Sequence, residues 1–572
     1  MPGGDFLITF SFLAAAVLLA GCSPADVPPS PQSDAKTSAE SVGSDTRVAP
    51  PADQTIGATI DDPLNAVIAR RDPARDGWDT ESINESAGQR LHELGDLLVA
   101  GFADRKEQTA AIFAPNPELP ALRPAQLSTV FSSDSLTVRR AGDVPRGHSA
   151  PPAHIAPELA GLVAPFTESR PAHVKFKIVR VALADDEVDT EVLYQADGPG
   201  HEGFTQQNAT WQVRWARTVG ADVLKINRIS VSEFTESTGP PTGETLLVDC
   251  TKAVLGGNES FEEQLMRGTN YWRRTMQTSL GIDLFGHQGL AIGDANGDGL
   301  DDVYLCQPGG VPNRLFIHRP DGTAIDHSAE AGLNILDRSR SALFLDLDND
   351  ADQDLALVAD STVLLWENDG AGRFVLAAEH DLGTSTTLTA ADYDNDGFVD
   401  IYVCGYSAPT GGANAPVPYH DANNGHRNQL LRNNGDWTFE DVTSQVGLDA
   451  DNTRYSFSAC WEDFDNDGDM DLYVANDFGR NCLYRNDDGQ FTNIARAAGV
   501  EDISAGMGVS WADYNQDGWM DIYVSNMFSS AGNRITYQRQ FNPSARAADR
   551  SEFQRHARGN SLFRGGPDGR FT

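Results

Sequence analysis

The sequence predicts a mainly β protein in which a β-propeller follows a small α+β domain. The chain has 572 residues, which is more than one ordinary domain accommodates. An acidic nine-residue motif recurs five times in the C-terminal half, and each copy leads into a short apolar run. The 53 Gly and 30 Pro residues favour many turns and short strands over long helices. Together these observations indicate at least two domains, the larger one built from repeats.

The composition narrows the class of partner. The chain carries 83 Asp and Glu residues against 43 Lys and Arg residues, a net charge of −40. Nucleic-acid binding requires basic surface, so no nucleic-acid partner is expected. A cation, a basic surface or a neutral glycan suits this charge. Hydrophobic residues make up 40% of the chain, which is enough for packed cores and argues against a wholly disordered protein.

Residues 1–21 have the pattern of a secretory signal peptide. The apolar stretch 6–20 is shorter than the roughly 20 residues of a membrane span. It ends in Leu19-Ala20-Gly21-Cys22, which resembles a bacterial lipobox and implies lipidation of Cys22. Residues 1–5 contain no Lys or Arg, so a plain cleaved signal with a chance cysteine is the alternative. Because Ser23 follows the cysteine, we expect an exported lipoprotein of the outer membrane or cell surface, attached to the membrane only through this anchor.

Residues 22–60 are predicted to be a disordered tether. They are rich in Pro, Ser, Ala and Asp and almost lack aromatic and branched apolar residues. Such a segment cannot bury enough apolar surface to fold, and it would hold the folded part away from a lipid surface.

Residues 61–255 are predicted to form the α+β domain. Ser82 and Glu85 are placed as a capping box at the start of a helix. Alternating segments near 174–178, 191–195, 210–217 and 223–234 predict the strands of an antiparallel meander. The helix itself is predicted by apolar residues at helical spacing, namely Ile83, Ala87, Leu91, Leu94 and Leu98.

Three large aromatic residues of this domain have two interpretations. Tyr194, Trp211 and Trp215 lie on the predicted strands. They could line a ligand pocket, or they could fill the core beneath a curved sheet.

Residues 256–572 contain the repeat. Each unit is interpreted as strand, acidic loop, strand, turn, strand, turn, strand, which is the content of one propeller blade. The loops start at Asp294, Asp346, Asp392, Asp463 and Asp513, at spacings of 52, 46, 71 and 50 residues. An isolated blade leaves sheet faces uncovered, and radial packing of blades buries them.

The loops are predicted to bind Ca²⁺ at about four to five sites. Positions 1, 3 and 5 can direct oxygen atoms to one point, Gly at position 6 permits the sharp turn, and Asp at position 9 closes the site. Nitrogen and sulphur ligands are absent from the loops, which disfavours zinc and copper. The predicted ligands are Asp294, Asn296, Asp298, Asp302, Asp346, Asp348, Asp350, Asp354, Asp392, Asp394, Asp396, Asp400, Asp463, Asp465, Asp467, Asp471, Asp513, Asn515, Asp517 and Asp521.

Two other interpretations of the loops agree less well with the sequence. An EF-hand is rejected, because position 12 of each loop is Leu or Val inside a β-like run and not Glu. Simple hydrogen-bonded Asx turns are opposed by electrostatics, since two carboxylates about 4 Å apart repel by roughly 1–4 kcal/mol. The third and fourth loops carry the complete pattern. Ala351 in the second loop, and Asn296 and Asn515 in the first and fifth, indicate weaker sites.

A second motif accompanies the loops. Asn-x-Leu-[Tyr/Phe/Leu]-Arg recurs at Asn428, Asn481 and Asn560. With the acidic loops, it resembles the FG-GAP/VCBS repeats of integrin-α-like propellers, and in particular the cartilage-acidic-protein-like, ASPIC/UnbV-associated group of bacterial proteins. The resemblance covers roughly residues 285–572. It implies a calcium-binding propeller, usually exported, that acts in ligand binding or adhesion.

The chain departs from that group in two respects. It has five loops, fewer than the blades usual in the group, and the group's C-terminal domain is missing. We therefore expect either a truncated chain or an unusual closure of the propeller. An open propeller would expose the edges of its sheets.

Two insertions interrupt the repeat and are candidate binding surfaces. Residues 529–559 contain six Arg residues, and Arg546, Arg550 and Arg555 are candidates for contact with an anionic ligand such as an acidic polysaccharide. Alternatively, these arginines pack on the protein's own acidic surface. Residues 405–428 contain His420 and His426, which could ligate a metal or be ordinary surface histidines.

No residue pattern assigns a reaction. Nucleophile-elbow, zinc-protease, phosphate-loop, haem and dinucleotide motifs are absent from the sequence. The favoured function is therefore binding of a glycan or protein ligand at the cell surface, without catalytic residues. A calcium-dependent polysaccharide lyase or hydrolase and a purely structural envelope protein are the alternatives.

Overall fold

The computed structural model describes residues 79–102, 105–142, 155–184, 187–217, 223–240, 247–276, 288–406, 416–538 and 540–572. Every described residue lies in one compact unit, which spans residues 69–572. The predicted signal peptide, Cys22 and the predicted tether lie outside the described residues. None of the helices in the described part of the chain has the length and apolar character that a membrane span requires.

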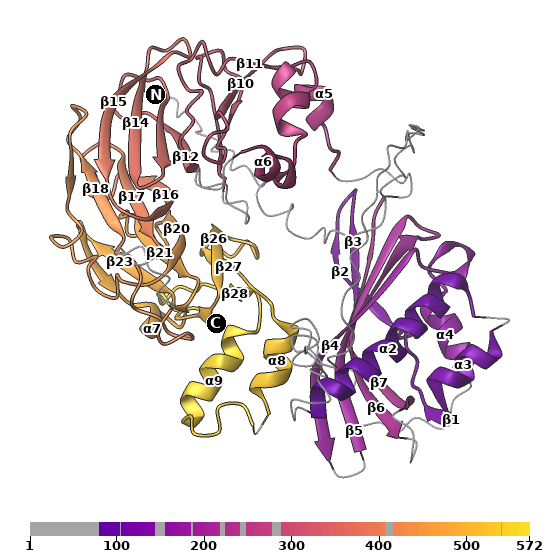
Figure 1. The fold of residues 1–572 in the computed structure, drawn as a ribbon. Coiled ribbons are helices and arrows are strands. Elements are labelled where there is room, and N and C mark those ends of the chain that lie inside the picture. The colour runs from indigo at the N-terminus through magenta and orange to yellow at the C-terminus, as the bar shows by residue number, and fades with distance from the viewer. Residues whose placement is uncertain are drawn as a thin grey trace, which may run out of the picture. The chain divides into compact units, whose positions relative to one another are not determined.

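The first domain is an antiparallel sheet with helices (Figure 1). Its strand order is β2-β3-β7-β6-β5-β4, and β1 pairs with β7 in parallel. The helices are α2 (Asp79–Ala100), α3 (Lys106–Ile112) and α4 (Ile155–Val163). The strands are β1 (Phe113–Glu118), β2 (Leu127–Ser132), β3 (Thr137–Ala141), β4 (His173–Ala184), β5 (Glu187–Pro199), β6 (Phe204–Arg217) and β7 (Leu224–Thr238).

Helix α2 packs against this sheet through the predicted apolar positions. All five of them, from Ile83 to Leu98, are buried in the same core as the inward residues of β5, β6 and β7. The predicted start of the helix is wrong. Asp79 begins α2, so Ser82 lies within the helix and does not cap it.

The three large aromatic residues fill the core, and Tyr194 also lines a cleft of about 490 Å³ on the sheet. Tyr194, Trp211 and Trp215 are at most 2% exposed. Tyr194 and Trp211 stack with their ring centroids 4.7 Å apart. The hydroxyl of Tyr194 donates to Gln207, so the core has a polar connection to the carboxylate of Glu236.

Short helices follow the sheet in the chain. These are α5 (Thr251–Leu255), the single π-helical turn η3 (Phe261–Leu265) and α6 (Thr269–Thr275). Asn258 and Gln264 join this segment to the first blade, where they donate to the backbone oxygens of Ala324 and Pro312.

The C-terminal half forms five successive antiparallel sheets, as the repeat predicts (Figure 1). Four have four strands and the fifth has three. The blades are β8 (Leu290–Gly293), β9 (Asp302–Leu305), β10 (Arg314–His318) and β11 (Ala324–Asp326); β12 (Ser339–Leu345), β13 (Asp354–Ala359), β14 (Thr362–Asn368) and β15 (Phe374–Asp381); β16 (Ser385–Ala391), β17 (Asp400–Gly405), β18 (Gln429–Asn433) and β19 (Phe439–Asp441); β20 (Ser456–Glu462), β21 (Asp471–Asn476), β23 (Cys482–Asp487) and β24 (Gln490–Asn493); and β26 (Gly506–Ala512), β27 (Asp521–Asn526) and β28 (Ser561–Phe563).

The first strand of each blade contacts the first strand of the next, which gives the radial arrangement of a β-propeller. Side chains on the two faces of the second strand enter different interblade cores. On β21, Leu472 and Val474 pack toward the third blade, whereas Tyr473 and Ala475 pack toward the fifth. Alternation along one strand therefore buries both faces of the blade.

The first and fifth blades each keep apolar side chains exposed. Tyr523 on β27 is 37% exposed, although its counterparts Tyr304, Tyr402 and Tyr473 are fully buried against a following blade. On β8, Leu290 and Ile292 are 54% and 40% exposed.

Further elements lie within the fourth and fifth blades and in the segment between them. They are the two-stranded sheet of β22 (Gly479–Arg480) and β25 (Ile503–Ser504), and the helices α7 (Ala495–Ala498), α8 (Ser530–Thr536) and α9 (Ala547–His556). Within the described residues the five cysteines, Cys250, Cys306, Cys404, Cys460 and Cys482, are free thiols.

Candidate metal centres

Each acidic loop connects the first and second strands of its blade. In the third blade, Asp392–Asp400 joins β16 to β17. The backbone is left-handed at positions 4 and 6, with φ of +57° at Asn395 and +95° at Gly397. The other four loops share both left-handed positions, so the motif encodes one loop conformation.

The first carboxylate of the loop collects backbone N–H groups from its far side. Asp392 accepts hydrogen bonds from the nitrogens of Asp396 (3.0 Å) and Gly397 (2.9 Å). Asp463 repeats both bonds with Asp467 and Gly468. This pairing curls the loop and places position 3 beside position 1.

The ninth residue ties the loop to the sheet. Asp400 is fully buried, and its Oδ2 accepts from Tyr393 N (3.2 Å) while its Oδ1 accepts from Asn433 N on β18 (2.8 Å). The equivalent carboxylates of all five loops accept the same two bonds. Position 9 is therefore part of the blade as well as of the loop.

Three loops bring three carboxylates to one point. In each, ligand oxygens from positions 1, 3 and 9 lie within 4.8 Å of one another, a spacing that could hold a metal ion. The groups are Asp346, Asp348 and Asp354; Asp392, Asp394 and Asp400; and Asp463, Asp465 and Asp471.

Several oxygens of these groups are buried without a hydrogen-bond partner. They are Oδ1 of Asp394 and of Asp465 at position 3, and Oδ1 of Asp346 in the second loop. A buried unpaired carboxylate oxygen costs free energy unless a cation or a donor meets it. In the first and fifth loops, position 3 is Asn296 or Asn515, and its Oδ1 accepts a backbone bond instead.

The electrostatics of the three loops also favour a bound cation. Burial is the main cause that raises the pKa of Asp354 and Asp400 to about 7 and that of Asp471 to about 8, and neighbouring carboxylates add to it. Burial and then Asp467 raise the pKa of Asp465. A bound cation would offset both the burial and the repulsion and would keep these groups ionised.

The remaining predicted ligands lie in the same loops but outside these three groups. At position 5, Asp298, Asp350, Asp396, Asp467 and Asp517 each accept a bond from the nitrogen of position 7. In the first and fifth loops, Asp294, Asp302, Asp513 and Asp521 keep the hydrogen bonds described for positions 1 and 9. Metal binding by these two loops stays a prediction.

The sequence reasoning missed an asparagine that joins each of the first three loops to the next blade. Asn433 on β18 donates from Nδ2 to the carbonyl of Leu347 in the preceding loop (2.7 Å), and Asn486 does the same to Tyr393 (2.8 Å). Asn368 bonds Ala295 in the first loop at 2.9 Å. This asparagine recurs in the sequence shortly before the glycine of the turn that follows the third strand, and that recurrence could have identified it.

The three candidate arginines have partners on this chain. Arg546 is exposed and pairs with Asp549 (2.6 Å). Arg555 donates to the backbone oxygen of Glu501 (2.9 Å). Arg550 reaches the backbone oxygen of Asn542 at 3.5 Å. Contact of these residues with an anionic ligand stays a prediction.

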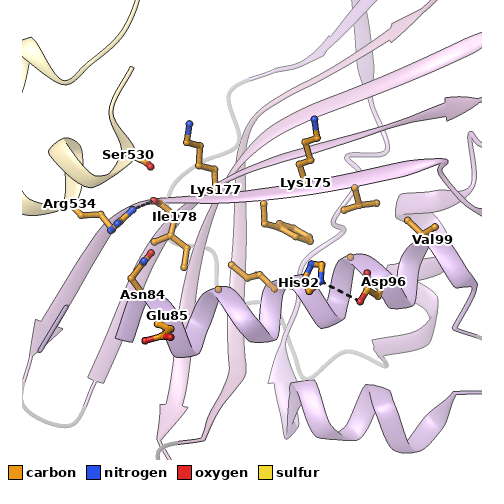
Figure 2. A pocket seen from close by; sticks show the side chains of 15 residues that line it. Asn84, Glu85, His92, Asp96, Val99, Lys175, Lys177, Ile178, Ser530 and Arg534 are labelled. Atoms are coloured by element: carbon orange, nitrogen blue, oxygen red, sulfur yellow. Dashed lines mark hydrogen bonds and ion pairs between the residues drawn. The ribbon is translucent and has the colours of Figure 1, made fainter. Parts of the chain in front are cut away.

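A separate cleft of about 710 Å³ lies along α2 and β4 (Figure 2). Leu91, Phe176 and Ile178 contribute apolar surface, and Lys175, Lys177 and Arg534 are among its charged residues. His92 and Asp96 pair with each other at 3.7 Å. Because its polar groups are dispersed or paired with one another, the cleft gives no indication of a specific chemistry.

Comparison with known proteins supports the repeat. The model of the FG-GAP-like repeat matches residues 294–357, 346–403, 421–474 and 463–524. None of the curated proteins matches this chain. Similar solved structures include an Agrocybe aegerita lectin that recognises non-reducing terminal N-acetylglucosamine, with 16% identity over 52% of this chain and 67% of the lectin, and a TM-score of 0.31.

Two further solved structures show comparably low similarity. The V. cholerae biofilm matrix protein Bap1 is 15% identical over 43% of this chain and 36% of its own, with a TM-score of 0.27. A Lactobacillus plantarum protein is 10% identical over 70% of this chain and 94% of its own, with a TM-score of 0.30. The repeats and the blades together identify the C-terminal half as a β-propeller of FG-GAP-like repeats.

Proposed function

We propose that this protein is a calcium-binding propeller that acts in ligand binding or adhesion. The observation that carries the proposal is the set of three carboxylate groups with buried, unpaired oxygens. Their donors are all hard oxygens, and backbone carbonyls of the loop can complete the six to eight ligands that Ca²⁺ takes. The first and fifth loops add weaker sites, for a total of about four to five.

The bound ions have a structural role in this proposal. Position 9 joins each loop to the third strand of its blade, so a cation there stabilises the blade as well as the loop. At ten times Kd, each site adds about 1.4 kcal/mol to the stability of the folded state. Several sites together would decide whether the propeller is folded at the temperature of the cell.

Calorimetry of the full chain with and without a chelator tests this function. Addition of millimolar Ca²⁺ is expected to raise the melting temperature strongly, with binding of about four to five ions per chain. A melting temperature that is equal in chelator and in Ca²⁺ would contradict the proposal. Mg²⁺ at the same concentration is the control for ionic strength.

The proposed ligand is an extracellular glycan or protein. The lipobox-like sequence at Cys22 supports export and a lipid anchor at the outer membrane or cell surface. Metabolic labelling with a radioactive fatty acid, compared between the natural chain and Cys22→Ala, tests the anchor. A glycan array probed in Ca²⁺ and in chelator tests the ligand class; catalytic turnover of an acidic polysaccharide would favour an enzyme instead.

A further inference from the structure

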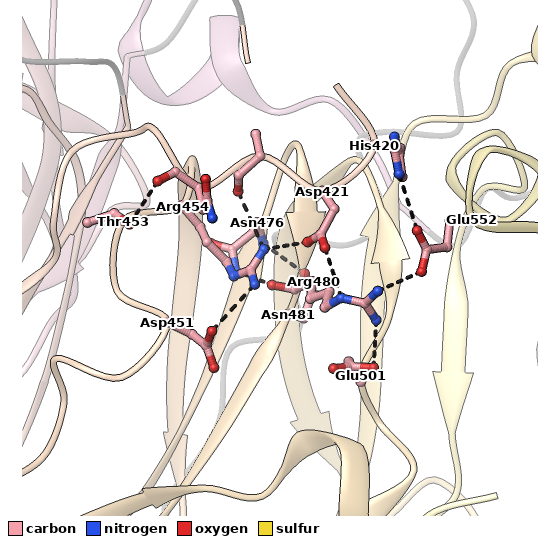
Figure 3. Close-up of polar contacts among 12 residues, drawn as sticks. His420, Asp421, Asp451, Thr453, Arg454, Asn476, Arg480, Asn481, Glu501 and Glu552 are labelled. Atoms are coloured by element: carbon pink, nitrogen blue, oxygen red, sulfur yellow. Dashed lines mark hydrogen bonds and ion pairs between the residues drawn. The ribbon is translucent and has the colours of Figure 1, made fainter. Parts of the chain in front are cut away.

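The two insertions of the propeller meet at a histidine. His420 belongs to the insertion between β17 and β18, and its ring packs on Phe553 of α9 with centroids 4.3 Å apart. Its Nε2 lies 3.2 Å from Oε2 of Glu552, also on α9 (Figure 3). The other predicted candidate, His426, lies apart from this contact, with its Nδ1 3.0 Å from the backbone oxygen of Arg427.

A third ligand-type group completes the cluster. Asp549 stands three residues before Glu552 on α9, so both carboxylates project from one face of the helix. One ligand atom from each of His420, Asp549 and Glu552 lies within 4.8 Å of the other two. All three residues are partly accessible, so an ion from solvent could reach them.

The spacing suits a single metal ion. A metal with Zn–N and Zn–O bonds of about 2.0–2.2 Å places neighbouring ligand atoms roughly 3.4 Å apart in tetrahedral geometry. The His420–Glu552 separation of 3.2 Å is close to this value. Asp549 accepts from Arg546 at 3.1 and 2.6 Å, and it would supply the third ligand in exchange for one of these exposed bonds.

The surrounding residues hold the carboxylates in place. Arg480 donates to Oε1 of Glu552 at 2.6 Å, which leaves Oε2 directed to His420. Arg480 also pairs with Asp421 (3.1 Å) and Glu501 (2.8 Å), so two further carboxylates share in balancing its positive charge. Hydrogen bonds of this kind, made to the outer oxygen of a ligand, are typical of metal sites.

We propose that His420, Asp549 and Glu552 bind one zinc-like divalent metal ion, separate from the acidic loops. One imidazole and two carboxylates, without thiolate, suit Zn²⁺ or Co²⁺, whereas the nitrogen ligand disfavours Ca²⁺. The ion fastens the insertion around His420 to α9. Three protein ligands leave a coordination position for water or for the carboxylate of a bound partner.

Binding of Co²⁺ to the full chain without a histidine tag, in millimolar Ca²⁺ that fills the acidic loops, tests the proposal. The expected result is one Co²⁺ per chain with visible ligand-field absorption, displaced by one equivalent of Zn²⁺. His420→Ala and Glu552→Gln should each weaken Co²⁺ binding by at least about tenfold. His426→Ala, a histidine of the same insertion, should leave it unchanged.

Asp549→Asn separates a metal site from a simple ion pair. It removes one ligand and leaves the His420–Glu552 contact intact, so it should weaken Co²⁺ binding only if the three residues share an ion. It also serves if His420→Ala fails to fold, because Asp549 is partly exposed on α9. No saturable Co²⁺ site, or equal affinity in Asp549→Asn and the natural chain, would show that His420 is only an ion-pair partner and would overturn the proposal.

Discussion

Asn481 donates a hydrogen bond from Nδ2 to the hydroxyl of Tyr473, 3.2 Å away, inside the fourth blade. Its Oδ1 accepts from the nitrogen of Asn476 at 2.8 Å, so one side chain closes the turn between β21 and β23. Asn313 makes the same bond to Tyr304 (2.9 Å), and Asn560 makes it to Tyr523 (2.6 Å). The recurrent Asn of the Asn-x-Leu motif is thus explained by a structural role within the blade.

Replacement of this asparagine should lower the stability of the protein most in a blade whose face is buried against the following blade. In Asn481→Ala, the nitrogen of buried Asn476 is left without a partner, at about 1–3 kcal/mol, and the hydroxyl of fully buried Tyr473 keeps only its bond to the backbone oxygen of Val500 (3.0 Å). Asn560→Ala is the matched control, because Tyr523 is 37% exposed and water can replace the lost bond. Thermal melts in Ca²⁺ measure the difference; equal losses in both variants would contradict this role.

Asp465→Ala should remove one cation from the fourth loop. Oδ1 of Asp465 is buried without a partner, and the substitution removes both the charge and the ligand oxygen at position 3, whereas the loop keeps its backbone bonds. We expect the Ca²⁺ stoichiometry to fall by one and the stabilisation at ten times Kd to fall by about 1.4 kcal/mol. Glu379→Gln on β15, an exposed carboxylate outside the loops, should change neither quantity in calorimetric titration.

The second loop contains a residue whose backbone strain can be relieved by substitution. Ala351 has φ of +78°, a left-handed conformation that costs a residue with a Cβ about 1–2 kcal/mol. Because Gly gains about 0.5–1 kcal/mol of freedom in the unfolded chain, Ala351→Gly should stabilise the blade by about 0.5–1 kcal/mol.

The converse substitution is the control for this prediction. Gly468 in the fourth loop has φ of +98°, and no neighbouring atom lies within 4 Å of the place that a Cβ would occupy, so Gly468→Ala tests the backbone conformation alone. It should destabilise by a similar amount. Chemical unfolding at saturating Ca²⁺ measures both variants, and a change of the same sign in both would exclude conformational strain as the cause.

Much of the propeller could be predicted from the sequence, because each acidic loop and its following strand are local and repeated. The spacing of Asp and Gly defines the turn. In the strands that follow, which begin at Asp400 and Asp471, side chains can only alternate between the two faces of the blade. The start of α2 could not be placed, since Ser82 is a good cap in isolation whereas the fold extends the helix to Asp79.

The candidate sites were less predictable, because their decisive contacts join distant residues. The unpaired state of Asp394 and Asp465 depends on burial by the folded loop. His420 meets Asp549 and Glu552 across more than a hundred residues, and only the packing of α9 on the propeller brings them together. A sequence pattern shows neither the burial of these carboxylates nor the packing of α9.

The α+β domain contains a buried ion pair whose pH dependence can be measured. Glu236 is 2% exposed, and Arg123 donates to both of its oxygens at 2.7 Å. Burial alone would raise the pKa of Glu236, but the bonds from Arg123 and Gln207 and the charge of Arg123 outweigh it and leave the pKa below its ordinary value.

The sign of the effect on stability follows from this shift. A carboxylate with a lowered folded pKa stabilises the protein above its unfolded pKa of about 4.3, and this contribution is lost as the pH falls through the folded pKa. Glu236→Gln should therefore cost about 3 kcal/mol at pH 7, because it leaves Arg123 without its charge partner. The difference from the natural chain should begin to shrink as the pH falls below about 4, and it should vanish once the pH is below the lowered folded pKa, where Glu236 is protonated as well.

Hydrogen exchange of the amides on β6 and β7, corrected for intrinsic rates, reports the stability of this domain separately from the propeller. Glu107→Gln on α3, an exposed carboxylate of the same domain, is the control and should behave as the natural chain at each pH. If Glu236→Gln were equally destabilising at pH 7 and pH 3, its effect would come from packing rather than charge. A difference confined to neutral pH would establish that the ionised pair with Arg123 holds these strands together.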